Sequence, residues 1–150
     1  MVRMSRLLPS LVAVALLAAC AAPQNDGPES IAEKTGVELP SALQPGDGAE
    51  PDFAPGAAWS DDTRESFVVV VYGSSTCAPT ATELATVDEK TLSLAFVYSQ
   101  GPDAPCTADL APNTYLLRTP DGVAASGEVS LEMTFLQGDE TSDSTVPILD

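Results

Sequence analysis

Three cysteines, Cys20, Cys77 and Cys106, are the side chains best suited to covalent chemistry in this sequence of 150 residues. The chain contains no histidine, so neither a Ser-His-Asp triad nor a histidine-activated cysteine can form. Cys77 and Cys106, without a histidine, also cannot complete the usual zinc ligand set. We therefore expect a protein that is not an enzyme, with no catalytic residue, no metal and no cofactor.

Paired acidic side chains are the remaining candidates for catalysis. Asp61 with Asp62, or Glu83 with Asp109, could serve in hydrolysis, but nothing in the sequence brings either pair together in a cleft. Asp109 follows Cys106 by three residues, a position more typical of a capping or turn residue. A small hydrolase is therefore the least favoured class of function.

A second acidic group, Asp139, Glu140 and Asp143, could hold Ca²⁺ in a loop. The spacing lacks the full set of ligands that an EF-hand loop supplies. We predict instead a solvated acidic loop from Gly138 to Ser144.

A polar turn precedes the second cysteine and is the candidate ligand loop of the chain, formed by Tyr72, Gly73, Ser74, Ser75 and Thr76. Loops that present several hydroxyls often bind ligands. The alternative, which we favour, is that these hydroxyls satisfy the backbone of a turn.

The N-terminus has the layout of a secretory signal peptide over residues 1–19. Arg3 and Arg6 precede a largely apolar stretch, Leu7 to Ala19, of 13 residues. A helix needs roughly 20 apolar residues to cross the hydrocarbon core of a bilayer. This stretch is therefore too short to remain as a transmembrane anchor.

The residues at the end of this stretch, Leu17-Ala18-Ala19-Cys20, are similar to the bacterial lipobox. That likeness implies that the Cys20 sulfur receives a diacylglycerol and becomes the new N-terminus after cleavage. Acyl chains bind a bilayer with about 0.8 kcal/mol per buried methylene. We expect Cys20 to be lipidated and the bilayer to be its partner, which places the protein on the extracytoplasmic face of the cell membrane.

With Cys20 acylated, Cys77 and Cys106 have only each other as partners. An exported protein with an odd number of cysteines has one that cannot join an internal disulfide, and acylation of Cys20 accounts for it. We predict a Cys77–Cys106 disulfide. By the chain-entropy estimate a bridge closing about 30 residues contributes roughly 3.5 kcal/mol.

The net charge excludes one class of partner. The sequence has 22 acidic and 6 basic residues; loss of Arg3 and Arg6 with the signal peptide leaves 4 − 22 = −18. Such a surface repels phosphate backbones, so we expect no binding to nucleic acid. We interpret the charge as a source of solubility rather than as a specific site for a cationic partner.

Residues 20–58 read as a lipidated cysteine followed by a Pro/Gly-rich flexible linker. This segment has too little apolar surface to offset its ordering entropy. Some 38 residues would span about 35 Å as a coil and roughly 115 Å if extended. Ser30 to Glu33 matches a capping box, but Gly36 and Pro40 allow a transient helix at most.

Residues 59–150 read as an all-β domain, a small antiparallel sandwich or barrel-like domain with one disulfide. The apolar run Phe67 to Tyr72 predicts a strand buried on both faces. Alternating residues from Leu92 to Tyr98 and from Val129 to Phe135 predict half-buried strands. Further strands are expected at Thr82 to Val87 and Thr114 to Thr119, with a short edge strand at Val146 to Leu149.

Three motifs follow one another in the folded region: Trp59, the valine-rich run ending in Tyr72-Gly73-Ser74-Ser75-Thr76-Cys77, and Cys106-Thr107-Ala108-Asp109 with Tyr115 beyond. On these motifs the region resembles small uncharacterised lipoproteins of high-GC Gram-positive bacteria. Thr76 and Ala78 replace a serine and a proline of that pattern. The resemblance implies a lipoprotein but supplies no activity.

These observations favour a membrane-anchored lipoprotein whose domain binds an envelope protein or a cell-wall component. The alternative is a structural or accessory envelope lipoprotein without a specific ligand. An exposed apolar patch or an open sheet edge would favour partner binding.

Overall fold

The structure is a computed structural model that describes residues 28–46, 53–101 and 104–150. The expected signal peptide and Cys20, the cysteine expected to be lipidated, lie outside these described residues. The regular structure of the described chain consists of strands and a single 3-10 turn, and the chain has one disulfide. The predicted all-β class is therefore confirmed.

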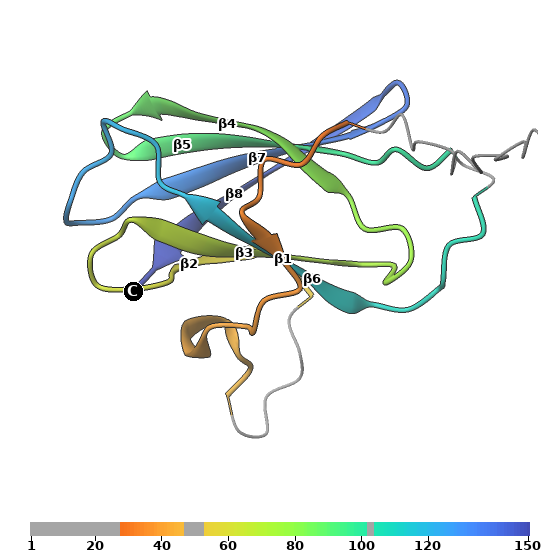
Figure 1. The fold of residues 1–150 in the computed structure, drawn as a ribbon, viewed down its shortest axis with the longest axis horizontal. Coiled ribbons are helices and arrows are strands. Elements are labelled where there is room, and N and C mark those ends of the chain that lie inside the picture. The colour runs from red at the N-terminus through yellow and green to blue at the C-terminus, as the bar shows by residue number, and fades with distance from the viewer. Residues whose placement is uncertain (1–27, 47–52, 102–103) are drawn as a thin grey trace, which may run out of the picture.

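The elements follow one another along the chain as strands joined by turns (Figure 1). They are β1 (Lys34–Thr35), the 3-10 turn η1 (Ser41–Leu43), β2 (Gly56–Trp59), β3 (Ser66–Gly73), β4 (Thr80–Asp88), β5 (Thr91–Val97), β6 (Ala111–Arg118), β7 (Ser130–Gln137) and β8 (Glu140–Leu149).

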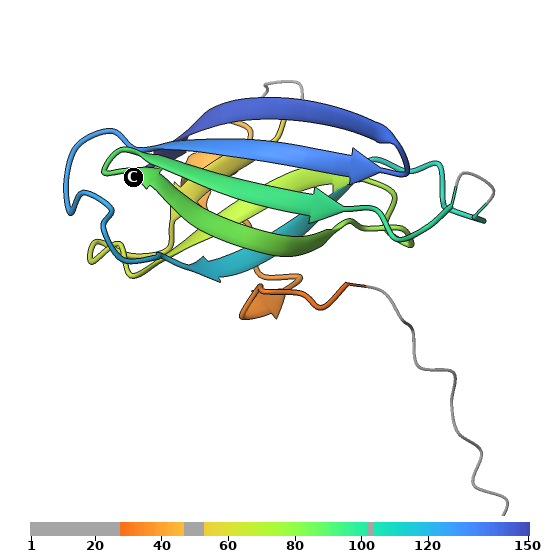
Figure 2. The same cartoon turned by 90° about the horizontal axis from the view of Figure 1, so that it is seen from above.

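One sheet of eight strands curls over so that its two halves face each other (Figure 2). The strand order is β1-β6-β3-β2-β8-β7-β5-β4. One layer holds β1, β6, β3 and β2, and the other holds β7, β5 and β4. Strand β8 joins them, because its first part pairs with β7 while Ile148 and Leu149 pair with β2. Most pairings are antiparallel, but β2 with β8 and β5 with β7 are parallel.

The core lies between the two layers and confirms the predicted strand patterns. All five residues from Phe67 to Val71 are buried, as expected for a strand covered on both faces. In β5, Leu92, Leu94 and Phe96 are buried and alternate with partly exposed neighbours. The same alternation buries Leu131 and Met133 of β7. Burial of these two faces against each other is the main stabilising term of the fold.

The segment between residues 31 and 43, which the sequence places in a linker, lies against the β-domain; we call it the N-terminal strap. Its backbone bridges the two outer strands of the curled sheet. The Ile31 amide donates to the Ala81 carbonyl of β4, and the Glu33 amide donates to Leu116 of β6, both at 2.9 Å. The expected transient helix is therefore replaced by extended chain, because the free edges of β4 and β6 supply the partners that its amides need.

The strap then crosses the outer face of the first layer. The Thr114 hydroxyl donates to the Val37 carbonyl at 2.7 Å. Leu43 lies so close to Gly56 that a β-carbon on Gly56 would meet the Leu43 Cδ2 atom at 2.9 Å. Val70 points to this face and lines a groove together with Leu43. The strap therefore covers the second face of β3, and β2 begins before the domain boundary expected at Trp59.

The predicted acidic loop from Gly138 to Ser144 is wrong in extent. Only Gly138 and Asp139 form the turn, and β8 begins at Glu140. Thr141 to Ser144 pair with β7 although their side chains are mostly exposed. Without a buried face these residues have no apolar alternation, so their strand conformation comes from backbone pairing alone.

The predicted edge strand at Val146 to Leu149 is instead the second half of β8, which lies between β7 and β2. Pro147 is tolerated there because it sits where β8 passes from one layer to the other.

Candidate functional site

The predicted disulfide joins Cys77, in the turn after β3, to Cys106, in the loop before β6. The Cα atoms of the two cysteines are 5.4 Å apart, within the usual range for a bridge. Cys77 is buried while Cys106 is exposed. The bridge therefore fixes two exposed turns to the end of the first layer, and it brings the two cysteine-containing motifs of the sequence together.

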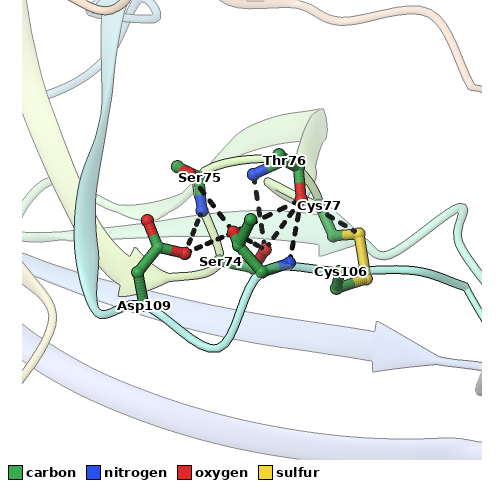
Figure 3. Close-up of a disulfide and its surroundings, with 7 residues drawn as sticks. Ser74, Ser75, Thr76, Cys77, Cys106 and Asp109 are labelled. Atoms are coloured by element: carbon green, nitrogen blue, oxygen red, sulfur yellow. Dashed lines mark hydrogen bonds between the residues drawn. A yellow bond between two sulfur atoms is a disulfide. The ribbon is translucent and has the colours of Figure 1, made fainter.

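Side-chain hydroxyls gather beside this disulfide (Figure 3). The Thr107 hydroxyl oxygen lies 2.9 Å from that of Ser74, 3.2 Å from that of Ser75 and 3.3 Å from that of Thr76. It donates its own proton to the Asp109 carboxylate. We call Ser74, Ser75, Thr76, Thr107 and Asp109 the hydroxyl cluster.

Backbone amides complete this cluster. The Ser75 amide donates to Asp109 Oδ1 at 3.1 Å, and the Thr107 amide donates to Thr76 Oγ1 at 3.0 Å. The Thr76 amide donates to Ser74 Oγ at 3.3 Å. Side chains and amides of the two turns thus bind each other, which cross-links the turns independently of the disulfide.

The charge on Asp109 is stabilised by these contacts. Hydrogen bonds from the side chains of Thr107 and Ser75, and from the Ser75 amide, lower the pKa of Asp109 from 3.8 to about 2. Such a carboxylate is a weak base, whereas a catalytic base at neutral pH needs a raised pKa. The arrangement favours the structural interpretation of Ser74, Ser75 and Thr76 over a ligand loop.

Tyr72 and Gly73, predicted as part of the ligand loop, do not lie in a loop, because they are the last two residues of β3. Gly73 pairs with Ala111 of β6. Tyr72 contacts Phe53 edge to face, with 5.5 Å between ring centroids. It also lines a groove of about 360 Å³ on the outer face of the first layer. Within the predicted loop, Tyr72 is therefore the residue placed in a cavity.

This groove, which we call the apolar groove, lies between the strap and strands β2, β3 and β8. It contains apolar and small side chains with one amide and one phenol, and neither acids nor basic side chains line it. Its residues are Ala42, Leu43, Gln44, Pro45, Ala54, Pro55, Gly56, Ala57, Val70, Tyr72, Val146, Pro147 and Leu149. Sequence reasoning missed it because eight of the thirteen lining residues fall in the segment interpreted as a linker.

The other acidic candidates lie apart from the disulfide. Asp61 accepts hydrogen bonds from the amide and the hydroxyl of Thr63 within a turn, and the side-chain bond from Thr63 is the main cause that lowers the pKa of Asp61. Asp143 accepts a hydrogen bond of 2.8 Å from Thr134 across β7 and β8. Across residues 28–46, 53–101 and 104–150, no group of three acids or cysteines is arranged to hold a metal ion.

The phenol of Tyr115 is buried behind the disulfide turn. Its hydroxyl donates to the Pro79 carbonyl at 2.5 Å. Burial, and secondarily the neighbouring Tyr98, raises the pKa of Tyr115. This side chain therefore stays neutral and fixes the start of β4 against β6.

In the described part of the chain, none of the helical segments has the length and apolarity required to cross a membrane. Comparison of the chain with protein-family models, with curated proteins and with solved structures found no match.

Proposed function

We propose that this protein is a membrane-anchored extracytoplasmic lipoprotein, held in the bilayer through acylated Cys20, whose β-domain is a non-enzymatic binding module of the cell envelope. The proposal has two parts, the anchor and the binding surface. Each has its own support and its own test.

The disulfide supports the export part of the proposal. Structural disulfides form and persist in oxidising compartments and are rare in the cytosol. A Cys77–Cys106 bridge therefore fits a domain that folds outside the cytoplasm. The lipobox-like Leu17-Ala18-Ala19-Cys20 then gives the third cysteine a use as the site of acylation.

The apolar groove carries the binding part. Its 360 Å³ falls at the lower end of the size range of ligand sites in proteins. Leu149, in its lining, is 39 % exposed, and Phe53, which packs on Tyr72, is 46 % exposed. Exposed apolar side chains around a groove mark an interaction site.

The chemistry of the groove favours one class of partner. Wall glycans are hydrogen-bonding polymers, and the groove offers them few polar side chains. An apolar or proline-containing segment of an envelope protein matches Leu43, Tyr72, Pro147 and Leu149 better. We therefore propose an envelope protein, rather than a cell-wall polymer, as the partner. An accessory lipoprotein without a ligand is the alternative.

Replacement of the lipidated cysteine tests the anchor. We expect Cys20→Ala to abolish incorporation of labelled palmitate and to leave the protein in the medium or as an unprocessed precursor. Ser74→Ala is the matched control and keeps the label and the membrane fraction. A Cys20→Ala protein that is processed and membrane-bound as before would refute the anchor.

A photo-crosslinking side chain at Gln44, an exposed residue of the groove, tests the binding surface in intact cells. The expected adduct with an envelope protein disappears in Leu149→Asp and persists in Leu110→Asp. Leu110 is a matched control because it is 59 % exposed and lies outside the groove. Equal adduct yields in the two variants would reject the groove as the binding surface.

A further inference from the structure

The N-terminal strap determines how far the domain can lie from its membrane anchor. Eleven peptide steps separate Cys20 from Ile31, the first residue whose amide bonds to the sheet. At 3.3–3.6 Å per residue, these steps reach about 40 Å when fully extended. The 36 steps from Cys20 to Gly56, where β2 begins, would reach about 120 Å. Docking of the strap thus shortens the maximum reach about threefold.

The strap has several independent attachments along its length. Besides the bonds from Ile31 and Glu33, the Gly36 amide donates to the Thr114 carbonyl at 3.0 Å. Arg118 pairs with Glu33 at 3.0 Å. Gly36 has a φ of 65°, a backbone conformation that side-chain-bearing residues rarely adopt. The glycine therefore permits the turn that takes the chain from β6 onto the outer face of the first layer.

The strap enters the domain at one particular end. Ser30 shares a cavity with Ala78, Pro79 and Thr80, which connect the disulfide to β4. The opposite end holds the turn between β2 and β3, where Arg64 contacts Gly127 and Asp150. Both views show the chain entering near the disulfide loops and the C-terminus at the other end (Figures 1 and 2).

We infer that the docked strap favours one orientation of the domain, in which the end carrying the Cys77–Cys106 disulfide and the hydroxyl cluster faces the lipid surface. In this orientation the turn from Ser60 to Glu65 and Asp150 lie on the side away from the bilayer. This inference rests on the proposed acylation of Cys20. A strand of nine residues such as β4 spans about 30 Å, so the two ends differ in their distance from the bilayer by a measurable amount.

Energy transfer from labelled protein to vesicles tests this orientation. A donor is placed at Asp139, in the turn between β7 and β8, or at Asp62, in the turn between β2 and β3. Asp139 belongs to the disulfide end because the adjoining strand contacts Tyr98, whose amide donates to Leu136. The lipidated full chain is inserted into phosphatidylcholine vesicles with acceptors on the headgroups. We expect roughly twofold higher transfer from Asp139 than from Asp62.

Release of the strap should remove this difference. The double variant Ile31→Pro with Glu33→Pro lacks the two amides that bond to Ala81 and Leu116. We expect transfer from Asp139 to fall to the value from Asp62. Glu29→Pro, which adds a proline ahead of the strap, is the matched control and keeps the difference.

The outcomes separate the inference from the proposal on which it rests. A mass spectrum without lipid on Cys20 refutes the anchor and this inference with it. Lipidated protein with equal transfer from both donors, or with a difference that survives release of the strap, refutes the orientation alone. Hydrogen exchange of the Ile31, Glu33 and Gly36 amides in the same protein reports docking directly: slow exchange supports it, and exchange at the rate of free peptide overturns it.

Discussion

The guanidinium group of Arg64 lies over the indole ring of Trp59, 5.0 Å from the ring centroid. Its Nη1 donates to the Gly127 carbonyl at 2.8 Å, and its Nη2 donates to Asp150 Oδ1 at 2.6 Å. The residue itself has a φ of 57°, in the left-handed region. One side chain therefore connects the turn between β2 and β3 to the loop before β7 and to the residue after β8.

Truncation of Arg64 should destabilise the domain by about 2 kcal/mol, because it removes a cation–π contact and two charge-assisted hydrogen bonds from a side chain that is 11 % exposed. Urea unfolding of Arg64→Ala measures this loss. Arg118→Ala is the control, since the Arg118 side chain is 79 % exposed, and should cost less than about 1 kcal/mol. Equal losses of stability in the two variants would show that Arg64 contributes no more than an ordinary surface ion pair.

A methyl group at Gly56 should loosen the strap. Its β-carbon would lie 2.9 Å from Leu43 Cδ2, so the Leu43 side chain must move away from β2. We expect Gly56→Ala to cost about 1 kcal/mol. Gly46→Ala, with nothing within 4 Å of the new atom, should be neutral. In the double variant with Leu43→Ala the two losses should not add; full additivity would mean that the two residues do not contact each other.

Removal of the disulfide should lower the free energy of unfolding by about 3.5 kcal/mol, because the bridge closes a loop of 29 residues in the unfolded chain. The variant is Cys77→Ser with Cys106→Ser, which leaves no free thiol in the domain. Urea unfolding should show a lower midpoint and a steeper dependence on denaturant, since the unfolded chain exposes more surface. An unchanged midpoint would contradict a stabilising bridge.

Stability should fall with acid through the titration of Asp109. Its folded pKa, about 2, lies below its ordinary value of 3.8. The stabilisation is therefore complete above about pH 4 and is lost as the pH falls from about 4 to about 2. Asp109→Asn should lower the unfolding midpoint at pH 7 and flatten its decline in this interval. Gln137→Ala, at the end of β7 and without a titratable group, should leave the decline unchanged.

NMR titration of individual carboxyl groups distinguishes the contribution of Asp109 from the contributions of the other acidic residues. NMR of the Asp109 carboxyl carbon should give a pKa about 2 in the folded protein and a higher value in Thr107→Ala, which removes the main hydrogen bond. Asp61, whose pKa is also lowered, should titrate identically in both proteins. A normal pKa for Asp109 in the unsubstituted protein would mean that the cluster does not form in solution.

The strands of the core could be predicted because apolar residues occupy their buried positions. Phe67 to Val71 are apolar at every position, as a strand covered on both faces requires. Leu92, Leu94 and Phe96 alternate because one face of β5 meets the core. The disulfide could be predicted by counting cysteines. In each case the prediction rests on apolar residues or cysteines, which are found in few other environments.

The strap and the first half of β8 could not be predicted for the opposite reason. Lys34 and Thr35 are exposed, and so are most residues from Glu140 to Ser144. Their conformation comes from backbone hydrogen bonds to β6 and β7, which any sequence can make. The apolar groove was missed with the strap, because Leu43 and Pro45 line it only once the strap lies on the outer face of the first layer.

The position of β8 has a consequence for how the chain matures. Residues 140–149 pair with both layers, so the two halves of the sheet have no common strand until this segment has been synthesised. A chain that lacks this segment cannot join β2 to β7 through β8. If the chain is exported as proposed above, the strands ahead of Glu140 would stay open, and so competent for passage, until β8 follows them.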